Sequence, residues 1–528
     1  MSYSLGINAT DATRTKNRTP KSVCPFSGLC SVCIEGCPGL CEVGSSALRG
    51  REMIYPQPFG TMTTAGQKDY PVDLSHFNIM GSAAGAYGIE ADSDKAIFPA
   101  VDVSAQIGGK NKINLKLPVV IPGLGSTKVA KDNWDGLAIG AAVSGVILTI
   151  GENVCGMDPD SEIVNGKVKK SPDMERRVKL YQEWSDGHGC IVVQANVEDD
   201  RLGVLEYAIK ELGVEAVELK WGQGAKDIGG EVKLHSIERA LQLKSRGYLV
   251  FPDPELPEVQ EAFKKGAFKE FERHSRVGMV SREGFIKRVK ELREFGAKYV
   301  FLKTGAYRPT DLARAVKFAS EAEIDLLTVD GAGGGTGMSP WRMMNEWGIP
   351  TVYIASLLYE YLKEIDMQGG YVPSVAIAGG FALEDQIFKG LALGAPYFNV
   401  VGMARAPLTA AMVGKTLGNL IKEGKVAGDL ARKYGTSYEQ VFVLAETLKK
   451  TYGKDFDKIP PAALGVYTYF DRIKVGLQQL MCGARKFTLK HIDRSDIAAL
   501  TKEAADVSGI DYVMDIDKEE ALKILRRR

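Results

Sequence analysis

The sequence lacks a strong excess of either charge, a long apolar run and a hydrophobic N-terminal segment. Its 528 residues carry 67 basic and 66 acidic side chains, and the net charge of +1 gives no reason to expect nucleic acid or an anionic membrane as a partner. No apolar run is long enough to span a bilayer. The N-terminal stretch is polar and lacks the hydrophobic core of a secretory signal. These absences predict a cytoplasmic globular protein.

Cysteine is scarce outside one short stretch near the N-terminus. Five of the eight cysteines fall in residues 24–41, and the spacing Cys30-x2-Cys33-x3-Cys37-Pro38 is similar to that of chains that wrap an iron–sulfur cluster. Four thiolates also suit zinc, whereas the cytosol and an odd number of cysteines disfavour disulfides. We expect an iron–sulfur cluster of the 4Fe–4S type, with zinc as the alternative. The ligands would come from Cys24, Cys30, Cys33, Cys37 and Cys41.

A glycine-rich stretch in residues 328–350 is the most informative part of the chain. The apolar run in residues 324–329 predicts a buried strand, and Asp330 stands where that strand should end. Five glycines then fall in residues 331–337, just before a helical pattern. Backbone amides that are exposed in such a turn, next to a helix start, suit an anion such as phosphate. A flexible surface turn is the alternative interpretation.

Short apolar strands alternate with helices from Leu117 onwards. This alternation is typical of a parallel sheet that is covered on both faces. Eight or more such units in one region favour an α/β protein with a (β/α)8 TIM barrel over one with an open sheet. The predicted strands lie in residues 117–126, 145–153, 189–196, 214–220, 247–254, 297–305, 324–331, 372–380 and 395–404.

The remaining regions flank this barrel. The sequence suggests four parts, which are a Cys-rich iron–sulfur segment (1–50), an irregular lead-in with short strands (51–116), the barrel (117–421) and a helical C-terminal region (422–528). The C-terminal region alternates apolar and charged residues at helical spacing, which predicts a helical cap or an oligomer surface. Within it, Cys482 is expected to be a packed thiol.

Polar residues and glycines recur at the ends of the predicted strands. A TIM barrel builds its active site where the carboxyl ends of its strands meet. The last two strands both end in glycines, a pattern that suits a phosphate group such as that of FMN. These strand-end residues are Gly123, Glu152, Gln194, Lys220, Lys303, Asp330, Gly379, Gly380 and Gly402.

The region 118–408 resembles the FMN-binding barrel domain of the glutamate synthase family. The resemblance rests most strongly on KWGQGAKDIGGEV, which begins at Lys220, and on GGGTGMSP, which begins at Gly333. It implies that Lys220 holds the carboxylate of 2-oxoglutarate or 2-iminoglutarate, with Glu152 and Gln223 also on the catalytic side. It also implies a set of FMN-binding residues, which comprises Gly123, Leu124, Gly125, Gln194, Lys303, Asp330, Gly334, Gly335, Thr336, Gly337, Gly379, Gly380, Gly402 and Met403.

The chain also departs from the family pattern. Gly333 stands where the family usually has an aspartate, and Asp330 lies three residues earlier. No cysteine lies between Cys190 and Cys482, so the family's three-iron cluster is expected to be absent. The chain starts with Met1-Ser2 rather than with the catalytic cysteine of an amidotransferase domain. We therefore expect a stand-alone form that receives ammonia from a separate glutaminase subunit, or uses free ammonium or another amine.

The resemblance implies an oxidoreductase of the glutamate synthase type. Reduced FMN would convert 2-iminoglutarate, formed from 2-oxoglutarate and ammonia, into glutamate, with electrons arriving through the iron–sulfur cluster. Ferredoxin or an NAD(P)H-oxidising subunit would be the electron donor, and we expect an oligomer. Two alternatives remain open, namely an electron-transfer subunit without imine chemistry and an amine-transferring relative that makes an N-substituted glutamate. Lys220, Glu152 and Gln223 favour imine chemistry, because an electron carrier needs no anchor for a substrate carboxylate.

Overall fold

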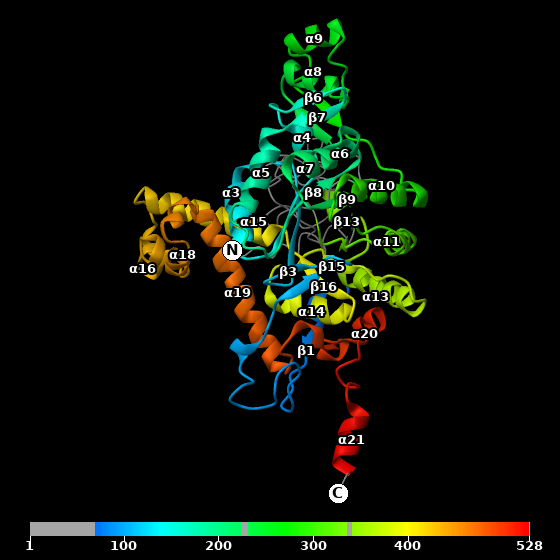
Figure 1. Ribbon diagram of the computed structural model, residues 1–528, viewed down its shortest axis with the longest axis vertical. Helices are drawn as coiled ribbons and strands as arrows, with labels where there is room; N and C mark the ends of the chain where they lie inside the picture. Colours follow the sequence, from blue (N-terminus) through cyan, green and yellow to red (C-terminus); the bar gives the residue numbers. More distant parts are fainter. Residues whose placement is uncertain (1–68, 223–230, 335–339, 527–528) are drawn as a thin grey trace, which may run out of the picture.

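The protein is built around a closed barrel of eight parallel strands (Figure 1). The computed structural model describes residues 69–222, 231–334 and 340–526. Around the barrel the strands follow the order β13-β14-β15-β16-β4-β5-β8-β9, so that the last barrel strand, β16, closes against the first, β4. The predicted TIM barrel is confirmed. The strands are β4 (Val119–Leu124), β5 (Ile147–Ile150), β8 (Ile191–Ala195), β9 (Ala216–Lys220), β13 (Tyr299–Thr304), β14 (Leu326–Asp330), β15 (Ser374–Ala378) and β16 (Phe398–Gly402).

The amino ends of the barrel strands are filled with apolar side chains. Every barrel strand contributes to one buried cluster, for example through Val120, Phe301 and Val400. The hairpin of β2 (Ala105–Ile107) and β3 (Ile113–Leu115) adds its own buried residues to that cluster and so closes this end of the barrel. Because this end is apolar and closed, a polar site can open only at the carboxyl ends of the strands.

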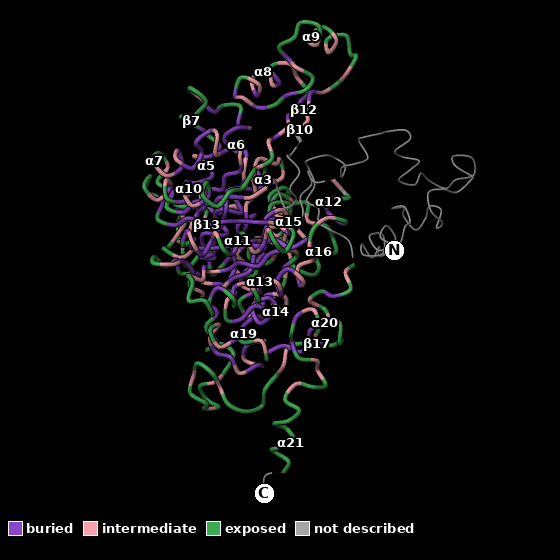
Figure 2. The backbone as a smooth tube through the Cα atoms, turned by 90° about the vertical axis from the view of Figure 1, so that its right-hand side faces the viewer, coloured by how far each residue is buried: buried purple, intermediate pink, exposed green. Residues whose placement is uncertain are grey.

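Helices cover the outside of the barrel, as the alternating pattern predicts. Figure 2 shows that the barrel backbone is mostly buried, whereas the outlying helices α9 and α21 are largely exposed. The covering helices are α3 (Lys128–Val143), α5 (Pro172–Gln182), α6 (Val197–Leu202), α7 (Val204–Leu212), α10 (Arg282–Phe295), α11 (Pro309–Glu321), α12 (Trp341–Asn345), α13 (Thr351–Met367), α14 (Glu384–Gly394) and α15 (Arg405–Lys422).

Two insertions extend the barrel at one end. After β5, helix α4 (Val154–Met157) is followed by the antiparallel pair β6 (Glu162–Val164) and β7 (Lys167–Lys170). Between β9 and β13, an antiparallel sheet has the order β10-β12-β11. Its helices α8 and α9 project beyond the barrel at the top of Figure 1. The bounds are β10 (Glu231–Leu234), α8 (Ile237–Ser245), β11 (Leu249–Phe251), α9 (Pro257–Lys264) and β12 (Phe271–His274).

The second insertion corrects one expectation. Residues 247–254 do contain a strand, β11, but it pairs antiparallel with β12 and takes no part in the barrel. In β11 only Val250 is buried, while Leu249 and Phe251 on either side are exposed. This alternation belongs to a strand with one covered face, whereas a barrel strand is covered on both.

The segment before the barrel and the C-terminal region pack together. Strand β1 (Phe77–Ile79) pairs antiparallel with β17 (Ile497–Ala499). Helix α19 (Pro461–Gly483) lies against α3 and α15. Its approach to α3 is so close that a Cβ at Gly136 would lie only 2.1 Å from the Cβ of Ala462. The helical C-terminal extension is therefore confirmed. Its other helices are α16 (Gly428–Tyr434), α17 (Tyr438–Val441), α18 (Ala445–Tyr452), α20 (Lys502–Ser508) and α21 (Lys518–Arg526).

Two features of residues 69–526 bear on the sequence-based expectations. Within the described parts of this range, no helix has the length and apolar content needed to cross a bilayer. Cys482, on α19, is partly buried and packs against the main apolar core, as expected.

Candidate active site

Two lysines stand side by side at the carboxyl ends of adjacent strands. Lys220 ends β9 and lies in register with Lys303 of β13. Both residues are buried, with relative exposures of 8% and 6%. Burying an ammonium group is costly unless a negative charge compensates for it, so each lysine needs a carboxylate nearby.

Lys220 is compensated by Glu152, which follows β5. Its Nζ lies 2.8 Å from Glu152 Oε1, and the two side chains are 4% and 15% exposed. Burial lowers the pKa of Lys220, although the adjacent carboxylate partly offsets this effect. Burial alone would raise the pKa of Glu152, but the charge of Lys220 and the hydrogen bond from it outweigh that effect and lower the pKa. Lys220 and Glu152, which are both predicted to be catalytic, thus form an ion pair. A substrate carboxylate would have to displace Glu152 in order to pair with Lys220.

Lys303 is compensated by Asp330, at the end of the next strand. The distance from Lys303 Nζ to Asp330 Oδ2 is 3.3 Å. Burial alone would lower the pKa of Lys303, but the negative charges of Asp330, Glu218 and Glu152 outweigh burial and raise it. Lys303 is therefore held as a cation in the mouth of the barrel.

A buried glutamate inside the barrel was missed by the sequence analysis. Glu218 is 3% exposed, and Gln194 Nε2 donates a hydrogen bond to its Oε1. Burial raises the pKa of Glu218, against the lowering effect of Lys303. The signal was present in the sequence, because Glu218 lies two residues before Lys220 in one strand and so shares its inward face.

The amide oxygen of Gln194 has no hydrogen-bond partner among the described residues. Gln194 is 1% exposed, and no donor in residues 69–222, 231–334 or 340–526 reaches its Oε1. Gly123 on β4 faces this amide, and a Cβ at that position would lie 2.7 Å from Gln194 Oε1. Unsatisfied buried acceptors are rare and often mark a ligand site. Gln194 therefore offers an acceptor to a bound group, as its predicted contact with a flavin ring requires.

Glycine is also required where the ends of β4 and β5 meet. A Cβ at Gly125 would lie 2.4 Å from the carbonyl oxygen of Glu152, and one at Gly151 would lie 2.6 Å from the amide nitrogen of Gly125. The carbonyl of Leu124, the last residue of β4, accepts a hydrogen bond of 3.0 Å from the Gly151 amide. This close packing fixes the backbone of Leu124 and Gly125 against the turn that carries Glu152.

The turn after Glu152 is held by a buried aspartate that the sequence analysis also missed. Asn153 has a left-handed backbone with φ of 66°, and its amide donates a hydrogen bond of 2.9 Å to Asp199 Oδ2. Asp199 is 1% exposed, and its Oδ1 makes no hydrogen bond to any residue that the structure describes. Burial, together with the charge of Glu152, raises the pKa of Asp199 to about 7. Asp199 completes a capping box with Asn196 at the start of α6, but this local motif does not reveal its contact with Asn153, 46 positions earlier in the chain.

The residues predicted to hold a phosphate lie at the ends of β15 and β16. Gly379 and Gly380 have φ of 119° and 110°, a region that side-chain-bearing residues rarely adopt. A Cβ at Gly380 would meet no atom of the described residues within 4 Å, so these residues leave space for a ligand beside the backbone. The next strand-end glycine, Gly402, packs tightly, since a Cβ there would lie 2.7 Å from that of Ala378. Met403 is fully buried, and its amide donates a hydrogen bond of 2.9 Å to the carbonyl of Val120 on β4.

Arg405 is a cation near this site that the sequence analysis did not single out. It begins α15, three residues after β16 ends. Burial lowers its pKa, while the charge of Asp330 acts in the opposite direction. In the described part of the chain, its guanidinium has no carboxylate within ion-pair distance. Guanidinium groups bind phosphate oxygens well because their donors match the geometry of the anion.

The remaining predicted residues are only partly covered by the structure. Gly334 is described, and a Cβ there would lie 2.5 Å from Asp330 Oδ1, so the glycine loop passes directly over this carboxylate. The predictions that lie outside the described residues concern Gln223, Gly335, Thr336, Gly337, Cys24, Cys30, Cys33, Cys37 and Cys41.

The second half of the barrel matches a known family. Residues 273–415 match the model of the conserved region in glutamate synthase. The match spans 143 of the 528 residues. This region runs from β12 into α15, and it includes Lys303, Asp330, the glycines that end β15 and β16, and Arg405.

Two relatives carry related names. The chain is 24% identical over 457 residues to a glutamate synthase large subunit-like protein of Rhizobium meliloti (strain 1021), covering 83% of this chain and 87% of the relative. It is 25% identical over 190 residues to the glutamate synthase large subunit-like protein YerD of Bacillus subtilis (strain 168). That match covers 35% of this chain and 32% of the relative. The resemblance to the glutamate synthase family therefore extends over most of the chain.

Solved structures give weaker similarities. A flavocytochrome b2 mutant aligns with a TM-score of 0.44 at 13% identity, covering 85% of this chain and 81% of that structure. An IMP dehydrogenase/GMP reductase-like protein from Corynebacterium glutamicum aligns with a TM-score of 0.42 at 10% identity, covering 81% of this chain and 93% of that structure. Similarity at this level has no bearing on the chemistry of the site.

Proposed function

We propose that this chain is a flavin-dependent oxidoreductase that uses FMN to reduce a 2-imino acid formed from 2-oxoglutarate and ammonia. The observation that carries the proposal is the buried pair of lysines in register at the mouth of the barrel, each held by a carboxylate. A parallel barrel has no structural need for two adjacent buried ammonium groups. Perturbed titratable groups in such a position are typical of functional sites.

The residues at the mouth of the barrel fit FMN. The open space beside Gly380 and the guanidinium of Arg405 suit a terminal phosphate, and the unsatisfied Gln194 Oε1 suits a ring N–H. Lys303 would place positive charge beside the ring, which stabilises an anionic reduced form. When bound and reduced, FMN would supply a hydride, which carries the two electrons needed to reduce the imine.

The ion pair beside this site would bind the substrate. The ammonium group of Lys220 is positioned to exchange Glu152 for a substrate carboxylate, and burial makes such a charge-assisted contact strong. Glu152 is ionised, since its pKa is lowered, and it would then face the protonated imine nitrogen. Asp199 would keep Glu152 in place through the Asn153 turn. Lys220 thus orients the substrate, and Glu152 stabilises its positive charge.

Electrons and ammonia would come from elsewhere. Four of the five N-terminal cysteines would hold a 4Fe–4S cluster that passes electrons from ferredoxin or from an NAD(P)H-oxidising subunit, and a separate glutaminase subunit would supply ammonia. This proposal rests on the cysteine spacing and on the similarity to glutamate synthase large subunit-like proteins. We further propose a cytoplasmic oligomer.

Anaerobic stopped-flow spectroscopy tests the proposed reaction. The purified protein is photoreduced and then mixed with 2-oxoglutarate and ammonium. We expect reoxidation of the flavin that requires both compounds and yields glutamate. Reoxidation by methylamine with 2-oxoglutarate, but not by ammonium, would favour the amine-transferring alternative. If neither mixture reoxidises the protein while an artificial electron acceptor does, imine reduction is wrong and the electron-transfer alternative holds.

A further inference from the structure

A carboxyl group lies inside the barrel, one layer below the two lysines at its mouth. Glu218 is the middle one of three inward-facing residues of β9, between Ala216 and Lys220. Ala216 belongs to the apolar cluster that fills the amino ends of the strands, whereas Lys220 ends the strand at the mouth. Glu218 is 3% exposed, so its carboxyl group lies between an apolar floor and the candidate active site. The proposed contacts to FMN and to the substrate do not use this group.

The hydrogen-bond partner of this carboxyl group is uncharged. Gln194 lies opposite Glu218 on the neighbouring strand β8, and its Nε2 donates a hydrogen bond to Glu218 Oε1. Within the described ranges no lysine or arginine forms an ion pair with Glu218, because the two lysines nearby are paired with other carboxylates. A buried carboxylate without its own cation is unfavourable. A change of charge nearby therefore decides whether Glu218 carries a proton.

The charged side chains around Glu218 come from four elements of the barrel. They are Lys303 of β13, its partner Asp330 of β14, Lys220 of β9 itself and Glu152, which follows β5. These four side chains comprise two ammonium groups and two carboxylates, so an ionised Glu218 adds one negative charge that none of them balances. Arg405, which interacts with the charge of Asp330, would be neutralised by the phosphate of FMN. Any further negative charge at the mouth therefore favours protonation of Glu218.

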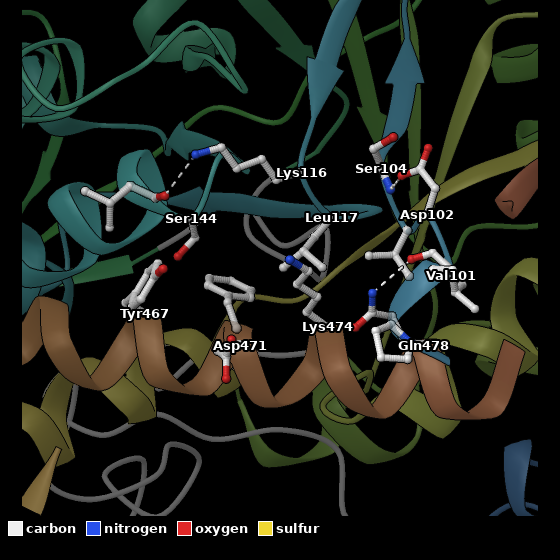
Figure 3. Close-up of a pocket in the computed structure, with 15 residues that line it drawn as sticks. Val101, Asp102, Ser104, Lys116, Leu117, Ser144, Tyr467, Asp471, Lys474 and Gln478 are labelled. Atoms are coloured by element: carbon white, nitrogen blue, oxygen red, sulfur yellow. Dashed lines mark hydrogen bonds between the residues drawn. The ribbon is translucent and has the colours of Figure 1, made fainter. Parts of the chain in front are cut away.

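The other end of the barrel is separated from Glu218 by apolar packing. The hairpin of β2 and β3 closes that end together with the apolar cluster. A cavity of about 520 Å³ lies between α19 and the segment that leads into β4 (Figure 3). Lys116 and Lys474 line this cavity, but Glu218 does not. Glu218 therefore responds to the charges at the mouth, where a flavin ring would lie.

We propose that Glu218 takes up a proton when the flavin is reduced and releases it when the flavin is oxidised again. This inference rests on the proposed binding of FMN, but not on the imine chemistry. Reduction by two electrons from an iron–sulfur or nicotinamide donor adds one proton at the flavin N5 and leaves one negative charge on the ring, beside Lys303. A second proton, from solvent, then converts the carboxylate of Glu218 into a carboxylic acid. The complete step consumes two electrons and two protons, and the net charge of the site stays the same.

The midpoint potential of the flavin in the full-length, FMN-loaded protein, measured as a function of pH, tests the proposal. Each proton that accompanies two electrons changes the reduction equilibrium tenfold per pH unit, which equals about 30 mV. Near neutral pH we expect the wild-type potential to fall by about 60 mV per pH unit, and that of Glu218→Gln by about 30 mV. The matched control is Glu215→Gln, which removes an exposed carboxylate that directly precedes β9 and pairs with Lys298. It should keep the wild-type slope.

Infrared difference spectra of the reduced and the oxidised protein identify the group that is protonated. Reduction should produce the C=O band of a carboxylic acid in the wild type and in Glu215→Gln, but not in Glu218→Gln. The proposal is overturned if the wild-type potential falls by only about 30 mV per pH unit, or if Glu218→Gln keeps a slope of about 60 mV. If Glu218→Gln does not bind flavin, the wild type decides, because a missing carboxylic acid band overturns the proposal. A wild-type protein that takes up no FMN contradicts the proposed function, and this inference falls with it.

Discussion

Replacing Lys220 by methionine separates the contribution of its ammonium group to binding from its contribution to stability. The Lys220–Glu152 pair is 2.8 Å long with side chains 4% and 15% exposed, so the variant leaves Glu152 buried without this cation. Breaking a buried ion pair on one side costs about 3–5 kcal/mol. We expect a loss near 3 kcal/mol, at the lower end, because Lys303 also stabilises the charge of Glu152.

A double variant and a control test this explanation. Lys220→Met combined with Glu152→Gln removes the remaining charge and should recover most of the lost free energy of unfolding. The control Lys298→Met breaks an exposed pair of 3.3 Å with Glu215 and should cost at most about 1 kcal/mol. Urea unfolding measures all three variants. A stability loss that persists in the double variant would show that the ion pair is not its cause.

Kinetics separate the two roles. In anaerobic stopped-flow experiments with 2-oxoglutarate and ammonium, both the single and the double variant should reoxidise about a hundredfold more slowly, equivalent to roughly 2.7 kcal/mol. Lys298→Met should match the wild type. If Lys220→Met reoxidises at the wild-type rate, Lys220 does not anchor the substrate, whatever its effect on stability.

Three other predictions concern the cofactor site and the Asn153 turn. Gly123→Ala should displace Gln194 and weaken flavin binding by about tenfold or more, measured by fluorescence titration of the apoprotein, whereas Gly483→Ala, with open space at its Cβ, should not. Arg405→Met should weaken FMN binding by about tenfold but leave riboflavin binding unchanged in the same titration, since only FMN carries a phosphate. Equal losses for both flavins would show that Arg405 does not contact the phosphate. Burial raises the pKa of Asp199 to about 7 in the folded state, against about 4 in the unfolded chain. Between these two pH values the folded protein keeps a proton that the unfolded chain has lost. The free energy of unfolding therefore falls as pH rises from about 4 to about 7. Asp199→Asn, which stays neutral, should therefore gain stability relative to the wild type from pH 5 to pH 8 in thermal unfolding, and a pH-independent difference would contradict this reasoning.

The barrel and the location of its site could be predicted because they depend on local patterns. Strands covered on both faces read as apolar runs, and the polar residue that ends each run, such as Lys220 or Asp330, must lie at the common open end. The strand in residues 247–254 was misplaced because a short apolar run does not distinguish a barrel strand from one with a single covered face.

The ion-pair and hydrogen-bond partners of the predicted site residues could not be predicted from local sequence patterns. The Lys220–Glu152 and Lys303–Asp330 ion pairs join different strands, and their formation depends on the register of the closed barrel. Asp199 reaches the site through the backbone of Asn153, so no side-chain motif reveals it. Glu218 is the exception, because its spacing from Lys220 places it on the inward face.

The absorption spectrum of the purified protein, taken before and after acid release of its cofactors, tests the central claim that this barrel is an FMN site. We predict flavin absorption and release of about one FMN per chain. Release of a flavin dinucleotide alone would contradict the phosphate site assigned to Gly380 and Arg405. A protein that contains no flavin and does not take up added FMN would contradict the account as a whole.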